Sequence, residues 1–281
     1  MPVKHQTSVT GSCFRVGPLA LERAGKVVLQ GARLQLHPGC LVALLGANGA
    51  GKSSLLAAMA QDVSAISTVP HQSAIAINGR SLEQLSSLDQ ARQRAILTQK
   101  PSLNFDLLVA EVVAMGAYPF PELTQADKDA FAHRALDLAG AQYLAERRYA
   151  SLSGGEQQRV QFARVLLQLL SACSIASEPC YLLLDEPTSS LDPQASQVVL
   201  RAAHQLSREA EVGVLVVLHD INLATLWADS IVLLHEGKVL ASGTPSSVVQ
   251  PDLIEHVYGM KVHVMPHPGH PVRPLVVFGR D

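Results

Sequence analysis

The sequence predicts an α/β fold with several parallel strands in one sheet. Short runs rich in Leu, Val and Ile, bounded by turn-forming residues, recur along the chain, and helical patterns lie between them. Near residue 50, a glycine-rich loop also joins one apolar run to the start of a helical pattern. These observations establish a fold class but not a function.

The expected elements alternate along the chain. Strands are expected at 41–45, 95–99, 181–184, 212–218 and 231–235. Helices are expected at 52–60, 123–139, 156–170 and 193–208. The second of these helices opens with a capping box from Thr124 to Asp127. It closes at Gly140, a residue suited to the left-handed conformation after a helix end.

The composition is that of an ordinary globular protein. Of 281 residues, 48% are hydrophobic and 16% are charged, and 22 Lys and Arg nearly balance 24 Asp and Glu. No strong field therefore favours nucleic acid or anionic lipid, so any phosphate site must be local. Without internal repeats or low-complexity linkers, we expect one domain over residues 1–281, with a helical subdomain inserted at about 100–162 and a short tail at about 251–281.

We expect the chain to stay in the cytoplasm. The polar segment Met1–Ser12 lacks the apolar core of a signal peptide, and no apolar run approaches the ~20 residues needed to cross a bilayer. In that compartment the four cysteines, which show no CxxC spacing, are expected to remain thiols.

A phosphate-binding loop is the first motif with a defined chemistry. Residues 46–53 read GANGAGKS and fit the pattern GxxxxGK[ST] between a buried-strand run and a helix. Small residues let successive N–H groups point at a phosphate, next to the positive end of the helix dipole. Lys52 would hold the β and γ phosphates and Ser53 would offer a hydroxyl to Mg²⁺, whereas the alternative is a glycine turn that binds nothing. The residues expected to contact ATP are Gly46, Asn48, Gly49, Ala50, Gly51, Lys52, Ser53 and Ser54.

An apolar run that ends in two carboxylates follows further along the chain. Residues 181–187 read YLLLDEP, which is a Walker B pattern. Asp185 at the carboxyl end of the strand can reach the shell of a Mg²⁺ ion, and Glu186 can orient and deprotonate the water that attacks the γ-phosphate. The alternative is a pair of carboxylates that merely solvates a strand end.

The run LSGGEQ at residues 152–157 narrows the assignment to one family. It resembles the signature of ABC ATPases, and chance agreement of six fixed residues beside the other two motifs is negligible. Ser153 and Glu156 also form an S-x-x-E capping box, a local role that is compatible with the signature. The resemblance implies that Ser153, Gly154, Gly155 and Glu156 contact ATP held by a second copy, across a head-to-tail dimer. It also implies the family fold, with a RecA-like core, an N-terminal antiparallel β subdomain and an inserted helical subdomain.

Three further positions match the family pattern. Gln99 resembles the Q-loop glutamine that senses the γ-phosphate and Mg²⁺, although by sequence it could be an ordinary loop amide. Asp192 resembles the D-loop aspartate and is also a sound N-cap before Pro193. His219 follows a buried strand and resembles the switch histidine at the γ-phosphate, although a lone histidine is more often structural. The resemblance thus implies Glu186, His219, Gln99 and Lys52 as catalytic residues and Ser53, Gln99 and Asp185 as Mg²⁺ ligands.

Within the ABC family, the sequence is most similar to ATPases of importers for haem, iron-siderophores and vitamin B12. The segments LVAEVVAMG at 108–116 and VLHDINLA at 217–224 are typical of that group, and residues 152–180 resemble the haem importers most. The resemblance implies ATP and Mg²⁺ as cofactors, a second copy and a transmembrane permease dimer as partners, and indirectly a periplasmic substrate-binding protein. It places the chain at the cytoplasmic face of the inner membrane, with no nucleic acid bound.

Several alternatives and departures remain at this level. The cargo could be a siderophore or vitamin B12; the chain could be a soluble ABC ATPase acting on nucleic acid or ribosomes, or a regulatory scaffold without hydrolysis. Leu21 aligns with the position of an aromatic that stacks on adenine, and the stretch between Lys52 and Asn78 is longer than expected. The tail carries four histidines that could bind metal or haem or could simply be packed or solvated. These histidines are His256, His263, His267 and His270.

Overall fold

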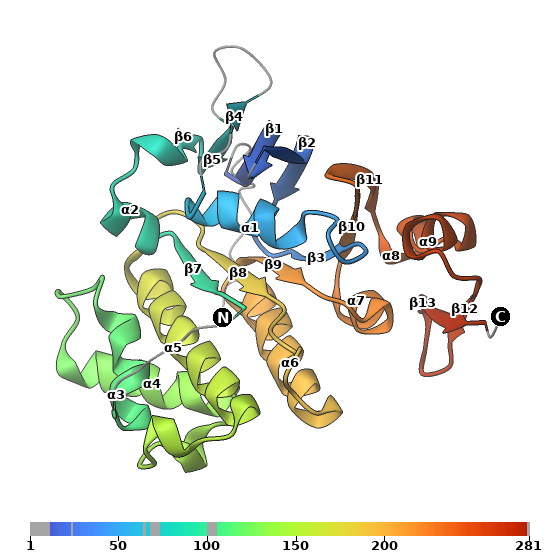
Figure 1. Cartoon of the computed structure of the whole chain (residues 1–281). Coiled ribbons are helices and arrows are strands. Elements are labelled where there is room, and N and C mark those ends of the chain that lie inside the picture. The colour runs from blue at the N-terminus through green and yellow to red at the C-terminus, as the bar shows by residue number, and fades with distance from the viewer. Residues whose placement is uncertain (1–11, 24, 64–65, 68–73, 100–105, 280–281) are drawn as a thin grey trace, which may run out of the picture.

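The computed structural model describes residues 12–23, 25–63, 66–67, 74–99 and 106–279. Figure 1 shows a central sheet with the long helices α5 and α6 on one side and α1 with a smaller antiparallel sheet on the other. The stretch between Lys52 and Asn78, which is longer than expected, lies partly outside the described residues. The expected start of the helical subdomain, at about residue 100, also lies outside them. Over the described residues, no helix has the length and apolar character that a membrane span requires.

The central sheet has the order β11-β10-β3-β9-β8-β7, and every neighbouring pair is parallel except β11 with β10. The predicted α/β class with several parallel strands is confirmed. The strands are β3 (Leu41–Leu45), β7 (Arg94–Leu97), β8 (Tyr181–Asp185), β9 (Gly213–Val217), β10 (Ser230–His235) and β11 (Lys238–Gly243).

Both faces of this sheet are covered, which explains why its inner strands are continuous apolar runs. Along β3, Leu41, Ala43 and Leu45 face one core together with α5 and α6. The alternate residues Val42 and Leu44 face a second core with α1 and the antiparallel sheet. The covering helices are α1 (Lys52–Ala60), α5 (Gly154–Ile175), α6 (Pro193–Glu209) and α7 (Ile221–Trp227).

The smaller sheet has the order β2-β1-β5-β6, with β4 paired to β1, and it matches the expected N-terminal antiparallel subdomain. Its register turns Leu21 into the core, opposite the equally buried Leu29. Leu21 is only 3% exposed, so it does not offer a surface to an adenine ring. The strands are β1 (Phe14–Arg23), β2 (Lys26–Leu36), β4 (Ile66–Ser67), β5 (Ile75–Ile77) and β6 (Arg80–Ser81).

A helical layer lies between β7 and β8 in the chain and includes the first part of α5. The capping box of Thr124 and Asp127 forms at the start of α4, and Gly140 has φ of 61° beyond its end, both as predicted. The boundaries of about 100 and 162 for a subdomain stay a prediction. The other helices between β7 and β8 are α3 (Val109–Ala114), α4 (Gln125–Leu138) and the 3₁₀ turns η2 (Met115–Ala117), η3 (Gln142–Leu144) and η4 (Tyr149–Ser151), whereas η1 (Leu82–Gln84) and α2 (Ser87–Ala91) precede β7.

The predicted bounds of α5 were wrong at both ends. The helix starts at Gly154, two residues earlier than expected, because the first turn follows directly on its N-cap Ser153. It continues to Ile175 because no breaker follows Leu170 and the next turn buries Ser171 and Ala172. Residues 171–175, ahead of β8, are therefore part of the helix.

The tail is folded and lies beside α7. It follows α8 (Pro245–Val248) and consists of α9 (Pro251–Tyr258) and a hairpin of β12 (Val262–His267) and β13 (His270–Phe278). Its histidines are spread over α9 and the hairpin. The rings of His267 and His270 have centroids 5.5 Å apart, and the ring of His256 lies 4.8 Å from that of His235 in β10. The described residues contain no group of three His, Cys, Asp or Glu side chains that could hold a metal ion.

Candidate nucleotide site

The glycine-rich loop follows β3 and runs into α1, as the pattern predicted. Gly46 has φ of 153°, and a Cβ there would lie 2.2 Å from the carbonyl oxygen of Leu234. Only glycine fits at that point, because the loop passes directly over the end of β10. The loop is thereby fixed at the carboxyl edge of the sheet, next to the N-terminus of α1.

The Lys52 side chain turns back over the loop. Its Nζ donates to the carbonyl oxygens of Gly46, at 2.7 Å, and Ala47, at 3.1 Å. Burial lowers the pKa of Lys52, while the nearby Glu186 and Asp185 carboxylates oppose that shift. A buried cation held by only two carbonyl groups suits a polyanionic ligand such as a nucleotide triphosphate.

The carboxyl ends of four adjacent parallel strands bring the predicted residues together. The loop follows β3, His219 follows β9, Asp185 ends β8 and Gln99 lies two residues beyond β7. Across this edge, Ser53 Oγ donates to Asp185 Oδ1 at 3.3 Å. Ligands commonly bind at this edge of an open α/β sheet.

Glu186 is the centre of a short hydrogen-bonded chain. Gln99 Nε2 donates to its Oε2 at 2.6 Å, and His219 Nε2 lies 2.6 Å from its Oε1. The Glu186 backbone has φ of 49°, a left-handed conformation that is costly for a side chain larger than glycine and that clusters at functional sites. Both partners therefore hold one carboxylate from opposite sides.

Asp185 titrates differently from an ordinary aspartate. Burial raises its pKa, and the Glu186 charge raises it further, whereas the Ser53 hydrogen bond and the charges of Lys52 and His219 lower it. The adjacent carboxylates thus repel one another, and a bound cation would relieve that repulsion.

The signature residues form the predicted capping box at the start of α5. Ser153 N and Ser153 Oγ both lie 2.8 Å from Glu156 Oε2, and Glu156 N donates to Ser153 Oγ at 3.4 Å. Gln157 N bonds the Ser153 carbonyl, which leaves the N–H groups of Gly154 and Gly155 ahead of the first helical hydrogen bond. The helix end therefore retains the features of an anion site.

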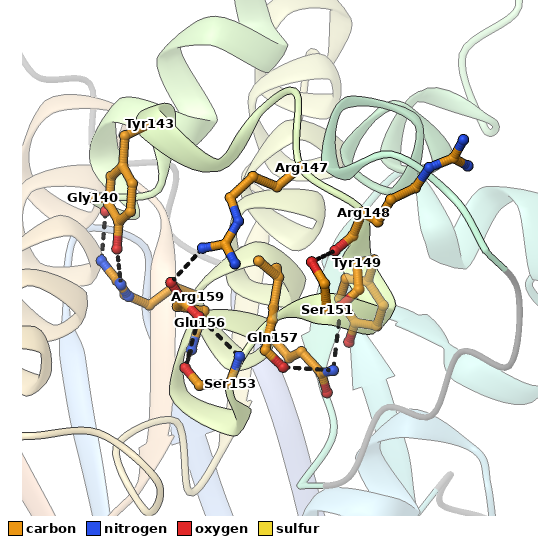
Figure 2. Close-up of polar contacts among 11 residues, drawn as sticks. Gly140, Tyr143, Arg147, Arg148, Tyr149, Ser151, Ser153, Glu156, Gln157 and Arg159 are labelled. Carbon is orange, nitrogen blue, oxygen red and sulfur yellow. Dashed lines mark hydrogen bonds and ion pairs between the residues drawn. The ribbon is translucent and has the colours of Figure 1, made fainter.

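Two arginines flank the signature, and the sequence motifs indicated neither of them. Figure 2 shows Arg147 directed at Glu156, with an Nη1 to Oε1 distance of 3.1 Å. It also shows Arg159 bonded to the Gly140 carbonyl at 2.6 Å and to the Tyr143 hydroxyl at 2.7 Å. Arg159 could have been found from its i+3 spacing to Glu156, whereas nothing in the sequence indicates the Arg147 contact.

Asp192 caps α6, since its Oδ1 accepts from Ala195 N at 2.8 Å. With Ser153, Gly155 and Arg159, it lines a surface depression of about 750 Å³. Among the described residues, no hydrogen bond or ion pair joins the signature residues to the group at the sheet edge, which consists of Lys52, Ser53, Gln99, Asp185, Glu186 and His219. One chain therefore holds the predicted site residues as two separate groups.

The chain matches a known family and similar proteins along most of its length. The model of a family described as ABC transporter matches residues 29–189. The hemin import ATP-binding protein HmuV of Bordetella avium is 53% identical over 250 residues, which cover 89% of this chain and 93% of that protein. The protein of the same name from Bordetella pertussis is 49% identical over 259 residues, covering 92% and 97%.

Solved structures with the same fold include ABC transporter subunits. The ATP-binding subunit of an ABC transporter superposes with a TM-score of 0.70 at 25% identity, covering 88% of this chain and 94% of that one. An inward-facing metal-chelate type ABC transporter gives a TM-score of 0.74 at 23% identity, covering 96% and 98%. At that identity the second likeness concerns the fold alone.

Proposed function

This chain belongs to the ABC transporter family, and from that premise we propose that it is the ATP-hydrolysing motor subunit of a haem importer. The family membership confirms the resemblance predicted from the motifs. The observation that carries the proposal is the convergence of Lys52, Ser53, Gln99, Glu186 and His219 on one sheet edge. The cargo rests on the relatives named hemin import ATP-binding proteins, which are about half identical to this chain.

The residues present fit Mg²⁺ as the ion that accompanies ATP. Ser53 and Asp185 supply oxygen donors, the ligand type that this hard cation prefers, and they already lie within hydrogen-bond distance of each other. Gln99 is the third proposed ligand. When bound there, Mg²⁺ would neutralise charge on the β and γ phosphates.

The proposed hydrolysis uses Glu186 as the base that takes a proton from the attacking water. Gln99 and His219 hold its two carboxylate oxygens, so the group is oriented before the nucleotide arrives. Lys52 exchanges its loop carbonyls for phosphate oxygens and stabilises charge on them. His219 is half exposed and would then face the γ-phosphate.

A complete site requires a second copy of the chain. The signature helix end and Asp192 lie apart from the sheet edge, but they present free N–H groups and a depression on the surface. A head-to-tail pair would bring this helix end onto the nucleotide of the other copy. ABC ATP-binding subunits of importers act as such dimers together with transmembrane permease subunits.

We also propose that the permease docks on the helical layer that follows Gln99. An apolar depression of about 470 Å³ lies between α3 and α4, and Tyr118 at its rim is 79% exposed. A large aromatic left in solvent is typical of a protein interface. The chain would be held in this way at the cytoplasmic face of the inner membrane, and a periplasmic binding protein would deliver the cargo from the other side.

The catalytic assignment is tested by Glu186→Gln, which keeps the size of the side chain. The variant should bind ATP normally while phosphate release falls by a factor of about 10² to 10⁴, the usual contribution of a general base. Glu178→Gln, at an exposed surface ion pair, serves as the matched control. Turnover close to that of the control would refute the role of Glu186.

The cargo is tested in liposomes that contain the chain with its permease. A binding protein loaded with haem should stimulate ATP hydrolysis, whereas the same protein loaded with cobalamin or an iron-siderophore should not. Stimulation by one of these and not by haem would refute the proposed cargo while leaving the ATPase intact.

A further inference from the structure

The tail hairpin is attached to the short helix that follows His219. The inner face of the hairpin buries Val262 and Val276, which belong to the same core as Ile221 and Ala224 of α7. Helix α7 starts two residues after His219. In Figure 1 the hairpin lies next to α7 and away from the helical layer.

The first turn of α7 is fixed to the hairpin by one side chain. Asn222 Nδ2 donates to the Val276 carbonyl at 3.0 Å, and Val276 N donates to Asn222 Oδ1 at 2.8 Å. The Asn222 amide thus pairs with both the N–H and the carbonyl group of Val276. An aspartate could accept but not donate here, and an alanine could do neither.

The last turn of α7 is fixed to the same strand. Arg273 Nη1 donates to the carbonyl of Ala228, the C-cap of α7, at 2.5 Å. A guanidinium satisfies one of the carbonyl groups left free at a helix end and matches the negative end of the dipole. Strand β13 therefore holds α7 at both ends.

This attachment matters because neither α7 nor His219 is rigid by itself. A helix of 7 residues is too short to be stable in isolation, so its position depends on its tertiary contacts. The side chain of His219 is 46% exposed, so packing does not fix it either. The backbone that enters α7 determines where the imidazole lies relative to Glu186.

We propose that Asn222 and Arg273 are positioning residues, which act through α7 to set His219 against Glu186, and that the C-terminal hairpin is thus part of the catalytic apparatus. The proposal rests on the role of His219 in the proposed function. It also gives the tail a role that does not involve metal or haem.

The test compares Asn222→Ala and Arg273→Ala with Met265→Ala, a control on the outer face of the same hairpin that is 48% exposed. In the whole 281-residue chain, both test variants should lower kcat for ATP on the order of 5- to 10-fold, because small displacements of catalytic groups are costly. KM for ATP should stay within about twofold, since the loop around Lys52 is untouched.

Two further measurements separate positioning from general destabilisation. Hydrogen exchange of α7 amides should accelerate in both variants while exchange in β3 and β8 stays unchanged. Arg273→Lys keeps a cationic donor at the end of α7 and should recover most of the lost kcat. Recovery would not be expected if the arginine only filled space.

Unchanged kcat in both alanine variants would overturn the inference, as would an equal loss in Met265→Ala or a matching rise in KM. If Glu186→Gln and His219→Ala lose turnover while the hairpin variants keep it, only the role of the hairpin fails. Full turnover in His219→Ala would instead overturn the proposed role of that histidine, and the inference with it.

Discussion

Replacing Gly154 by alanine should separate stability from activity. Gly154 is the first residue of α5, and a Cβ built there meets no heavy atom within 4 Å. Within one chain the added methyl is therefore free of clashes. Alanine in a helix is about 0.5–1 kcal/mol more stable than glycine, and a helix end realises at most that amount.

The same methyl would point into the space through which the nucleotide of a second copy must approach the helix end. The N–H of residue 154 is kept, but the methyl would hold the nucleotide away from it. We therefore expect ATP turnover to fall by about tenfold or more, since losing one well-placed N–H contact to a transition state costs about 10² to 10³ in kcat. The unfolding midpoint should meanwhile stay constant or rise by ~1–3 °C. Phosphate release at saturating ATP and thermal unfolding without nucleotide measure the two effects.

Gly155→Ala is the matched control, because a Cβ at Gly155 would lie only 3.0 Å from the Ser190 carbonyl oxygen. That variant should lose stability and turnover together. If Gly154→Ala gains stability and hydrolyses ATP as fast as the parent chain, the helix end contacts no nucleotide, and the proposed dimer is wrong.

Three more outcomes follow from the site and the core. Lys52→Ala should weaken ATP binding by about 10- to 100-fold in a fluorescence titration, because a charged hydrogen bond contributes roughly 1.5–3 kcal/mol; unchanged affinity would contradict the Lys52 assignment. Hydrogen bonds from Ser153 lower the pKa of Glu156, so its stabilising effect is complete above the unfolded pKa of about 4.3 and disappears as pH falls through the folded value. Glu156→Gln should accordingly lower the urea midpoint at pH 7, and the difference from the parent chain should shrink as pH falls below about 4; a difference that does not change with pH would contradict this. Leu166→Ala, at a fully buried position in α5, should cost ~2–5 kcal/mol in urea unfolding, and a loss below about 1 kcal/mol would mean that the helix repacks.

The proposed nucleotide site at the edge of the sheet could be predicted from sequence because each of its parts combines a local pattern with a strand end. The bounds of β3 and α1 agree with the prediction residue for residue, because the glycine-rich loop determines where the strand ends and where the helix begins. Asp185 and His219 follow apolar runs. The carboxyl ends of parallel strands meet at one edge of the sheet, independently of the conformation of the connecting loops.

The parts that the sequence left open or placed wrongly depend on tertiary contacts. The face on which Leu21 lies is decided by the register of β1 against β2, which no local pattern specifies. The end of α5 depends on burial of its last turns rather than on a breaker residue. The contact between Asn222 and Val276 joins residues 54 positions apart, so no local sequence pattern indicates it.

The way Lys52 is held has a consequence for product release. Its ammonium group has two carbonyl acceptors, from Gly46 and Ala47. In the proposed cycle, these acceptors would keep the buried cation from being left without a partner as ADP and phosphate leave. The loop carbonyls would in this way lower the free-energy cost of emptying the site.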